Sequence, residues 1–287
     1  MRKVQSVVWL PLLAVIFVIL RTIGIPIVDE AMLIVLIVGL FIVGIPHGAL
    51  DVWTHRARQT GRSDWIYVSM YLACIGLCFF AWHSFPVAGL FVFLLLSAWH
   101  FGQADVRLWN QKRGAMLWGT SVLLGILGWH INEMIPIIEN MGVVVTEQLW
   151  NEQAEVSVKV LSTLGWVGFT ARAISIRNWA WVGVLAFLAI TPFMPLLHAF
   201  GLYFIGQHSF AGWHHLRVRL NQSNSQLWKR ASPFSIGAWI IIIMGIWFLD
   251  NEKMDADATA GAFFMLLGSI SIPHIFESHE LLRNGAD

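Results

Sequence analysis

Charged residues are scarce in this sequence. Only 12% of its 287 residues are Asp, Glu, Lys or Arg, whereas 57% are hydrophobic. Because an ordinary soluble domain carries about 25% charged residues, this shortage excludes a soluble globular protein. The mean hydropathy of +0.67 and the sixteen Trp residues indicate an integral membrane protein, with apolar side chains facing lipid and indoles at the two interfaces.

Net charge and cysteine are also nearly absent. The 18 Lys and Arg residues almost cancel the 17 Asp and Glu residues, so no bulk basic field is available to attract nucleic acid, and we exclude a nucleic-acid partner. Cys74 and Cys78 lie four residues apart in an apolar run, where a regular helix cannot close a normal disulfide between them. We expect both to be packing residues, and we expect no iron–sulfur cluster.

Long apolar runs occupy most of the chain. A helix needs about 20 apolar residues to cross the roughly 30 Å hydrocarbon layer, and we count ten such segments. We therefore expect an all-α polytopic bundle of about ten transmembrane helices, forming a single domain over residues 1–287. Nine spans is the alternative, because the sixth segment carries Lys159 and only Pro192 to Pro195 separates the seventh and eighth. The segments lie near 6–28, 31–50, 65–82, 84–102, 114–131, 156–172, 178–196, 198–214, 234–250 and 260–276.

The loops between these segments alternate in charge. All but three of the 18 basic residues fall on one side of the membrane, the exceptions being Arg21, Lys159 and Lys253. Cytoplasmic loops collect Lys and Arg, so this pattern predicts that both termini are cytoplasmic. It also predicts a multi-pass protein of the cell (cytoplasmic) membrane.

Four of the eleven histidines fall at one depth of the predicted bundle. His47, His100, His208 and His274 each lie near the end of a span that runs from outside to inside. Ionisable residues within spans are costly and usually face the bundle interior, so four at one depth predict a metal site near the cytoplasmic face. The alternative for each is an imidazole hydrogen-bonded to a neighbouring helix or placed at the interface.

Carboxylates follow three of these histidines closely. Asp51 and Glu277 stand four and three residues after His47 and His274, a spacing that puts each pair on one helix face. Asp105, five residues after His100, is better placed to serve a metal ligand on a neighbouring helix, or a loop. Metal-bound histidines usually donate their second ring N–H to a carboxylate, carbonyl or water, so we take the three as candidate supporting residues. The alternative is interfacial carboxylates paired with nearby arginines.

An all-histidine donor set suits iron, zinc or copper, whereas magnesium prefers oxygen ligands. Zinc hydrolysis, haem ligation and non-haem iron chemistry all remain open, although a cluster at a single depth favours a non-haem ion. His208 and His215 are seven residues apart, about 10 Å along a helix, so both reach one ion only if the helix distorts near Gly212.

Four motifs resemble one known family in their order and spacing. They are Pro46–Asp51, Trp99–Asp105, Tyr203–Ser209 and Pro273-His274. In these motifs the chain resembles, over about residues 40–280, the Brp/Blh family of membrane-bound bacterial and archaeal β-carotene 15,15′-dioxygenases. This resemblance implies an Fe(II) enzyme that cleaves the central double bond of β-carotene with O2 into two molecules of all-trans-retinal. It also implies a substrate that comes from the lipid bilayer and a product often supplied to a microbial rhodopsin.

The resemblance implies that His47, His100 and His208 are metal ligands. Members of the family commonly have another histidine four residues after the third, but here that position is Gly212. The fourth ligand is therefore left open among three residues: His214, His215 and His274.

Two other functions compete with the carotenoid-cleaving oxygenase. A transporter with a histidine proton relay would distribute its histidines along the membrane normal, with broken helices near the midplane. A carotenoid- or retinal-binding accessory protein would keep the fold but lack the metal.

Overall fold

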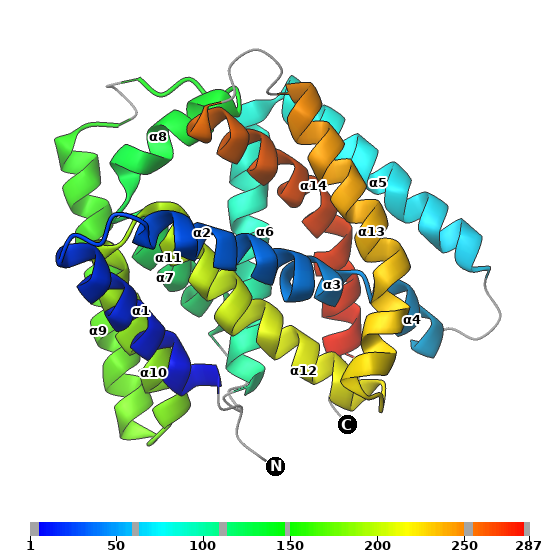
Figure 1. Cartoon of the computed structure of the whole chain (residues 1–287), viewed down its shortest axis with the longest axis horizontal. Helices are drawn as coiled ribbons and strands as arrows, with labels where there is room; N and C mark the ends of the chain where they lie inside the picture. The colour runs from blue at the N-terminus through cyan, green and yellow to red at the C-terminus, as the bar shows by residue number, and fades with distance from the viewer. Residues whose placement is uncertain (1–5, 59–62, 109–113, 147–149, 250–254, 284–287) are drawn as a thin grey trace. The chain divides into compact units, whose positions relative to one another are not determined.

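The computed structural model describes residues 6–58, 63–108, 114–146, 150–249 and 255–283, and throughout these ranges the regular elements are helices (Figure 1). The predicted all-α class is confirmed. The described residues group into two compact units. The first unit takes residues from 1–44, 101–134 and 145–213, and the second from 45–100, 135–144 and 214–287. Three helices, α6 (Pro86–Leu108), α8 (Ile131–Asn140) and α12 (Phe210–Arg219), have residues in both units.

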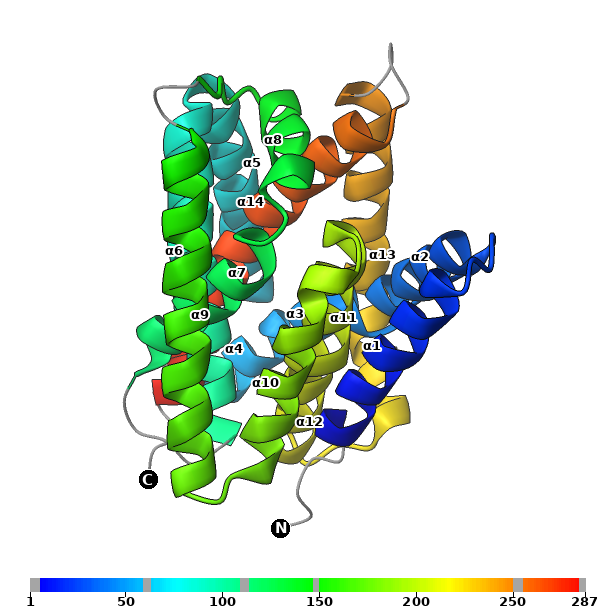
Figure 2. The ribbon, with the colours of Figure 1, turned by 90° about the vertical axis from the view of Figure 1, so that its left-hand side faces the viewer.

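In the first unit, α10 packs against both α1 and α9 (Figure 2). The side chains of Asn151 and Asn178 cap α9 and α10, each accepting a hydrogen bond from a first-turn backbone N–H. Trp118 and Trp181 are buried, with ring centroids 5.5 Å apart and perpendicular rings. These two indoles therefore form part of the interior. The helices of this unit are α1 (Ser6–Thr22), α2 (Val28–Gly39), α7 (Ala115–Leu127), α9 (Glu152–Ser175), α10 (Trp179–Ile190) and α11 (Leu196–Tyr203), with a 3-10 turn at Thr191–Phe193.

Two π-helical segments interrupt the α-helices of the first unit and contact each other. They are η1 (Leu40–Gly44) and η3 (Phe204–Ser209). A π-helical turn inserts extra backbone and changes the direction in which the residues after it point, and such turns are frequent at functional sites. Here η1 ends three residues before His47 in the sequence, and η3 contains His208.

In the second unit, α14 packs against both α5 and α13 (Figure 1). The side chain of Asp255 accepts a hydrogen bond from the backbone N–H of Ala258 and so caps the start of α14. The short helix α4 contacts α5 and α14, so that residues near 51–58 meet those near the end of the chain. The helices of this unit are α3 (Ile45–Gly48), α4 (Asp51–Arg58), α5 (Asp64–Ser84), α13 (Asn224–Leu249) and α14 (Ala256–Arg283).

Five described helical segments are long and apolar enough to cross a membrane, which makes the chain a membrane protein. A sixth arises if the pair Ala115–Leu127 and Ile131–Asn140, bent by 96°, counts as one span. Trp9–Thr22 and Trp179–Phe193 are apolar but shorter. The expected count of about ten spans is therefore not confirmed, and the cytoplasmic placement of the termini stays a prediction, since residues 1–5 and 284–287 lie outside the described ranges. The five long segments are Val28–Ala57, Asp64–Ser84, Pro86–Val106, Asn224–Phe248 and Ala256–Leu281.

Candidate metal centre

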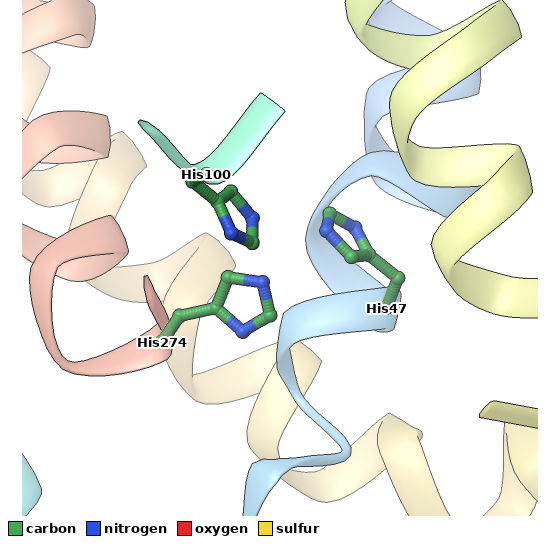
Figure 3. A group of neighbouring side chains, drawn as sticks. All are labelled: His47, His100 and His274. Carbon is green, nitrogen blue, oxygen red and sulfur yellow. The ribbon is translucent and has the colours of Figure 1, made fainter. Parts of the chain in front are cut away.

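Three histidines of the second unit converge on one point (Figure 3). His47 lies on α3, His100 on α6 and His274 on α14, so helices far apart in the sequence each contribute one ring. One ring nitrogen from each residue lies within 4.8 Å of the other two. Ligand atoms held at about 2.1 Å from one ion lie roughly 3–4 Å apart, so small side-chain rotations bring all three onto one ion.

His274 is the central ring of this group. Its centroid is 5.0 Å from that of His47 and 5.1 Å from that of His100, with interplanar angles of 89° and 86°. His47 and His100 are buried, and the His274 side chain is only 12% exposed. The His274 ring therefore meets each of the other two imidazoles edge to face, largely out of contact with solvent.

The His274 ring has one nitrogen engaged and one available. Its Nδ1 lies 3.0 Å from both carboxylate oxygens of Asp51 and donates to them. Its Nε2 is buried and makes no hydrogen bond to any residue in the described ranges. A buried nitrogen lone pair beside two further imidazoles fits a metal ion of the kind that prefers nitrogen ligands.

Asp51 pairs with a different histidine from the one expected. The spacing placed it beside His47 on the same helix face, but its hydrogen bond goes to His274, 223 residues away. Tyr71 of α5 donates a second hydrogen bond to Asp51, at 2.8 Å. Packing of α14 against α4 and α5 brings the three residues together, and spacing within one helix cannot show such packing.

Glu277 also has partners on a neighbouring helix. Its Oε1 accepts a hydrogen bond from the Thr54 hydroxyl at 2.9 Å, and its Oε2 lies 3.8 Å from Nδ1 of His55. Both partners belong to α4, so Glu277 joins α14 to α4 one turn beyond the histidine group.

Asp105 lies in the first unit, at the centre of a separate polar group. It is fully buried and accepts hydrogen bonds from Trp118, Tyr203 and Gln207 at 2.8–2.9 Å. These three donors come from α7, α11 and η3, and none of them is an imidazole, so a role of Asp105 toward a metal ligand stays a prediction. Gln207 directly precedes His208, so this carboxylate anchors the π-helical turn that carries His208.

Two of the five candidate ligands lie outside the three-histidine group. His208 is buried in the first unit, where its ring contacts Phe101 and Phe204 at 4.6 and 5.7 Å between centroids. His215 is exposed on α12, and the neighbouring His214 is half-buried. Among the described residues, the group that can hold a metal ion consists of His47, His100 and His274.

Other buried histidines have ordinary structural roles. His130 contacts the backbone carbonyls of Ile126 and Met194, and His198 contacts that of Asp29. These two imidazoles are hydrogen-bonded to neighbouring segments, which is the alternative to a metal-ligand role.

Tyr71 and Gly48 also belong to the site, although the sequence patterns gave neither residue a role of its own. Tyr71 has no helical spacing to any histidine motif, and its signal was only its rarity, because the chain has three Tyr residues. Gly48 follows His47, and a Cβ there would lie 3.4 Å from Nδ1 of His274. A single Cβ fits at that distance, so Gly48 leaves room beside the His274 ring for a methyl group but not for a larger side chain.

Fold and site together define a helical membrane protein with a buried histidine group suited to a metal ion. Comparison with known proteins identifies it further. The family model described as beta-carotene 15,15′-dioxygenase matches residues 38–278, and the chain belongs to that family of carotenoid-cleaving enzymes, which confirms the resemblance found in the motifs. The beta-carotene 15,15′-dioxygenase of an uncultured marine bacterium, 66A03, is 25% identical over 252 residues, covering 81% of this chain and 88% of the relative. No solved structure matches the chain.

Proposed function

We propose that this protein cleaves the central 15,15′ double bond of β-carotene with O2 to give two molecules of all-trans-retinal. The observation that carries the proposal is the convergence of His47, His100 and His274 inside a membrane protein of the carotenoid-cleaving family. One O2 and one β-carotene give two aldehydes, each with one oxygen atom, so the reaction consumes no proton and no external reductant.

The cofactor of this proposal is Fe(II), held by the imidazoles of His47, His100 and His274. A bound Fe(II) supplies the activation of O2 that an alkene and a protein side chain cannot supply by themselves. Three neutral imidazoles add no negative charge and leave coordination positions open, as O2 chemistry requires. Burial of His47 and His100 keeps bulk water away from these positions.

The exposed apolar side chains of two helices support the substrate class. β-Carotene is a long apolar polyene that dissolves in the hydrocarbon of a bilayer, and the α5 and α6 helices expose large apolar side chains such as Phe80 and Phe91. A substrate that reaches the protein from lipid meets no charged barrier on such surfaces. We place the enzyme in the cytoplasmic membrane, where a microbial rhodopsin is a suitable recipient of retinal.

The remaining candidates from the sequence have narrower roles in the proposal. The family resemblance assigns a ligand role to His208, and this stays a prediction, as does any role of His215. We propose that Glu277 supports the site through Thr54 and that Asp105 orients Gln207, the residue before His208. Clustering of three imidazoles supports an oxygenase over a proton relay, in which histidines are spaced along the membrane normal.

Retinal formation in a β-carotene-producing bacterial host tests the proposal. The host expresses the parent chain, a His100→Ala variant and a His83→Ala control, since His83 is exposed at the end of α5. We expect retinal from the parent and the control, none from His100→Ala, and iron in the purified parent. Intact β-carotene beside abundant, iron-loaded parent protein would refute the substrate assignment, and parent protein without iron would refute the cofactor.

A further inference from the structure

We propose that Tyr71 and Asp51 are positioning residues that hold the His274 ring with its Nδ1 protonated and its Nε2 directed at His47 and His100. This inference rests on the proposed metal centre. It concerns Tyr71, to which the sequence gave no role, and Asp51, which the helical spacing had paired with His47 instead of His274. Its basis is a chain of two hydrogen bonds that links α5, α4 and α14.

The acceptor in this chain determines the His274 tautomer. A carboxylate accepts hydrogen bonds and donates none, so the 3.0 Å contacts from Asp51 require a proton on Nδ1 of His274. The neutral ring then has its lone pair on Nε2, the nitrogen without a hydrogen bond in the described ranges. A carboxylate partner also raises the basicity of a ligating imidazole.

Tyr71 acts on His274 only through Asp51. Its hydroxyl donates to Oδ2 of Asp51 at 2.8 Å and fixes the plane of the carboxylate, which would otherwise rotate about a soft torsion. Both oxygens of that plane face Nδ1 of His274 at the same distance. Tyr71 therefore has no effect on the ring once the carboxylate is gone.

Three residues of the segment Pro46–Asp51 thus surround the His274 ring. His47 supplies a neighbouring imidazole at 5.0 Å between centroids, Gly48 leaves room for the ring, and Asp51 holds its Nδ1. Three residues of this short segment therefore bear on the same distant ring: His47 and Asp51 contact it, and Gly48 leaves space beside it.

A double-mutant cycle on metal binding tests the inference. The full chain is purified in detergent as parent, Asp51→Asn, Tyr71→Phe and the double variant, all close to isosteric. Tyr67→Phe, one turn before Tyr71 on α5, and Asp64→Asn, at the exposed start of α5, are matched controls. The probe is Co(II) alone, read by its dissociation constant and by its visible ligand-field absorption, with the thermal unfolding midpoint measured separately.

We expect Asp51→Asn to weaken Co(II) binding about 10- to 100-fold and to change the ligand-field spectrum, as loss of a carboxylate partner does elsewhere. Tyr71→Phe weakens binding less, and adds nothing further in the Asp51→Asn background. The controls bind like the parent. A purely structural role would instead lower the unfolding midpoint and leave the spectrum of the bound ion unchanged.

Three results would overturn the inference. Parent-like Co(II) affinity and spectrum in both single variants would show that the pair does not position His274, while leaving the metal centre intact. If the fold-losses of Co(II) affinity in the two single variants multiply in the double variant, Tyr71 acts independently of Asp51. A parent chain that binds no Co(II), Fe(II) or Zn(II) would refute the metal centre itself, and this inference with it.

Discussion

Gly48 offers a graded test of the site, because a single position controls the space beside His274. A Cβ at this position would lie 3.4, 3.5 and 3.7 Å from Nδ1, Cγ and Cε1 of the His274 ring. These are ordinary or only slightly tight van der Waals distances, so we expect Gly48→Ala to leave metal affinity unchanged. Valine adds two methyl groups about 1.5 Å beyond Cβ, and at least one of them must meet the ring.

The consequence for Gly48→Val follows from this geometry. The ring must move away from α3, which lengthens the 3.0 Å contact between His274 and Asp51 and turns Nε2 away from its neighbours. Loss of that support weakens metal binding about 10- to 100-fold, equivalent to about 1.4–2.8 kcal/mol. Competition between the protein and a chromophoric chelator for Co(II) measures the change.

Gly76→Val is the matched control for this series. Gly76 lies on α5 in the same unit, is exposed, and has no atom within 4 Å of a built Cβ. We expect it to bind Co(II) like the parent. Equal Co(II) affinity in Gly48→Val and Gly76→Val would refute the view that Gly48 leaves room for His274, and an equal loss in Gly48→Ala and Gly48→Val would show that backbone conformation matters there instead of size.

Three further outcomes are expected. Asp105→Ala removes the acceptor of three buried hydrogen bonds and costs at least about 3 kcal/mol in unfolding by denaturing detergent. The control Asp64→Ala unfolds like the parent, because its ion pair is screened by solvent, and a loss at Asp105 no larger than at Asp64 would contradict the anchoring role of Asp105. Chelation of the bound metal lowers the midpoint of thermal unfolding of the parent, because the ion binds only the folded state. If chelator still lowered the midpoint of a His47→Ala variant, the ion would bind elsewhere. The family resemblance implies that His208 is a ligand, and in that case His208→Ala loses iron. Iron at the parent level in this variant would show that His208 is not a ligand.

Much of this protein is set by local properties of the sequence. Hydropathy and the shortage of charge identified a helical membrane protein, because each apolar residue favours lipid or the protein interior wherever it stands. The motifs around His47, His100 and His274 identified three residues that the structure brings together, since polar groups within spans are costly and gather in the interior. The same motifs pointed to the carotenoid-cleaving family, which the comparison confirms.

These local properties could not predict the number of transmembrane spans. An apolar run of about 20 residues satisfies the length rule whether it becomes one straight span, a bent pair or two short helices. Segments such as Trp179–Phe193 are apolar but short in the structure, and Ala115–Leu127 turns through 96° into the next helix. Gly, Pro and packing decide where a helix ends, and hydropathy alone does not register them.

The pairing of polar groups was decided by tertiary structure alone. Helical periodicity placed Asp51 with His47, yet Asp51 binds His274 and receives a hydrogen bond from Tyr71, two residues on other helices. Spacing along one helix specifies which residues share a face, but the partner of that face depends on which helix packs there and at what rotation. The sequence determined which residues are candidates for the chemistry of this protein, and the packing of α4, α5 and α14 determined which of them contact one another.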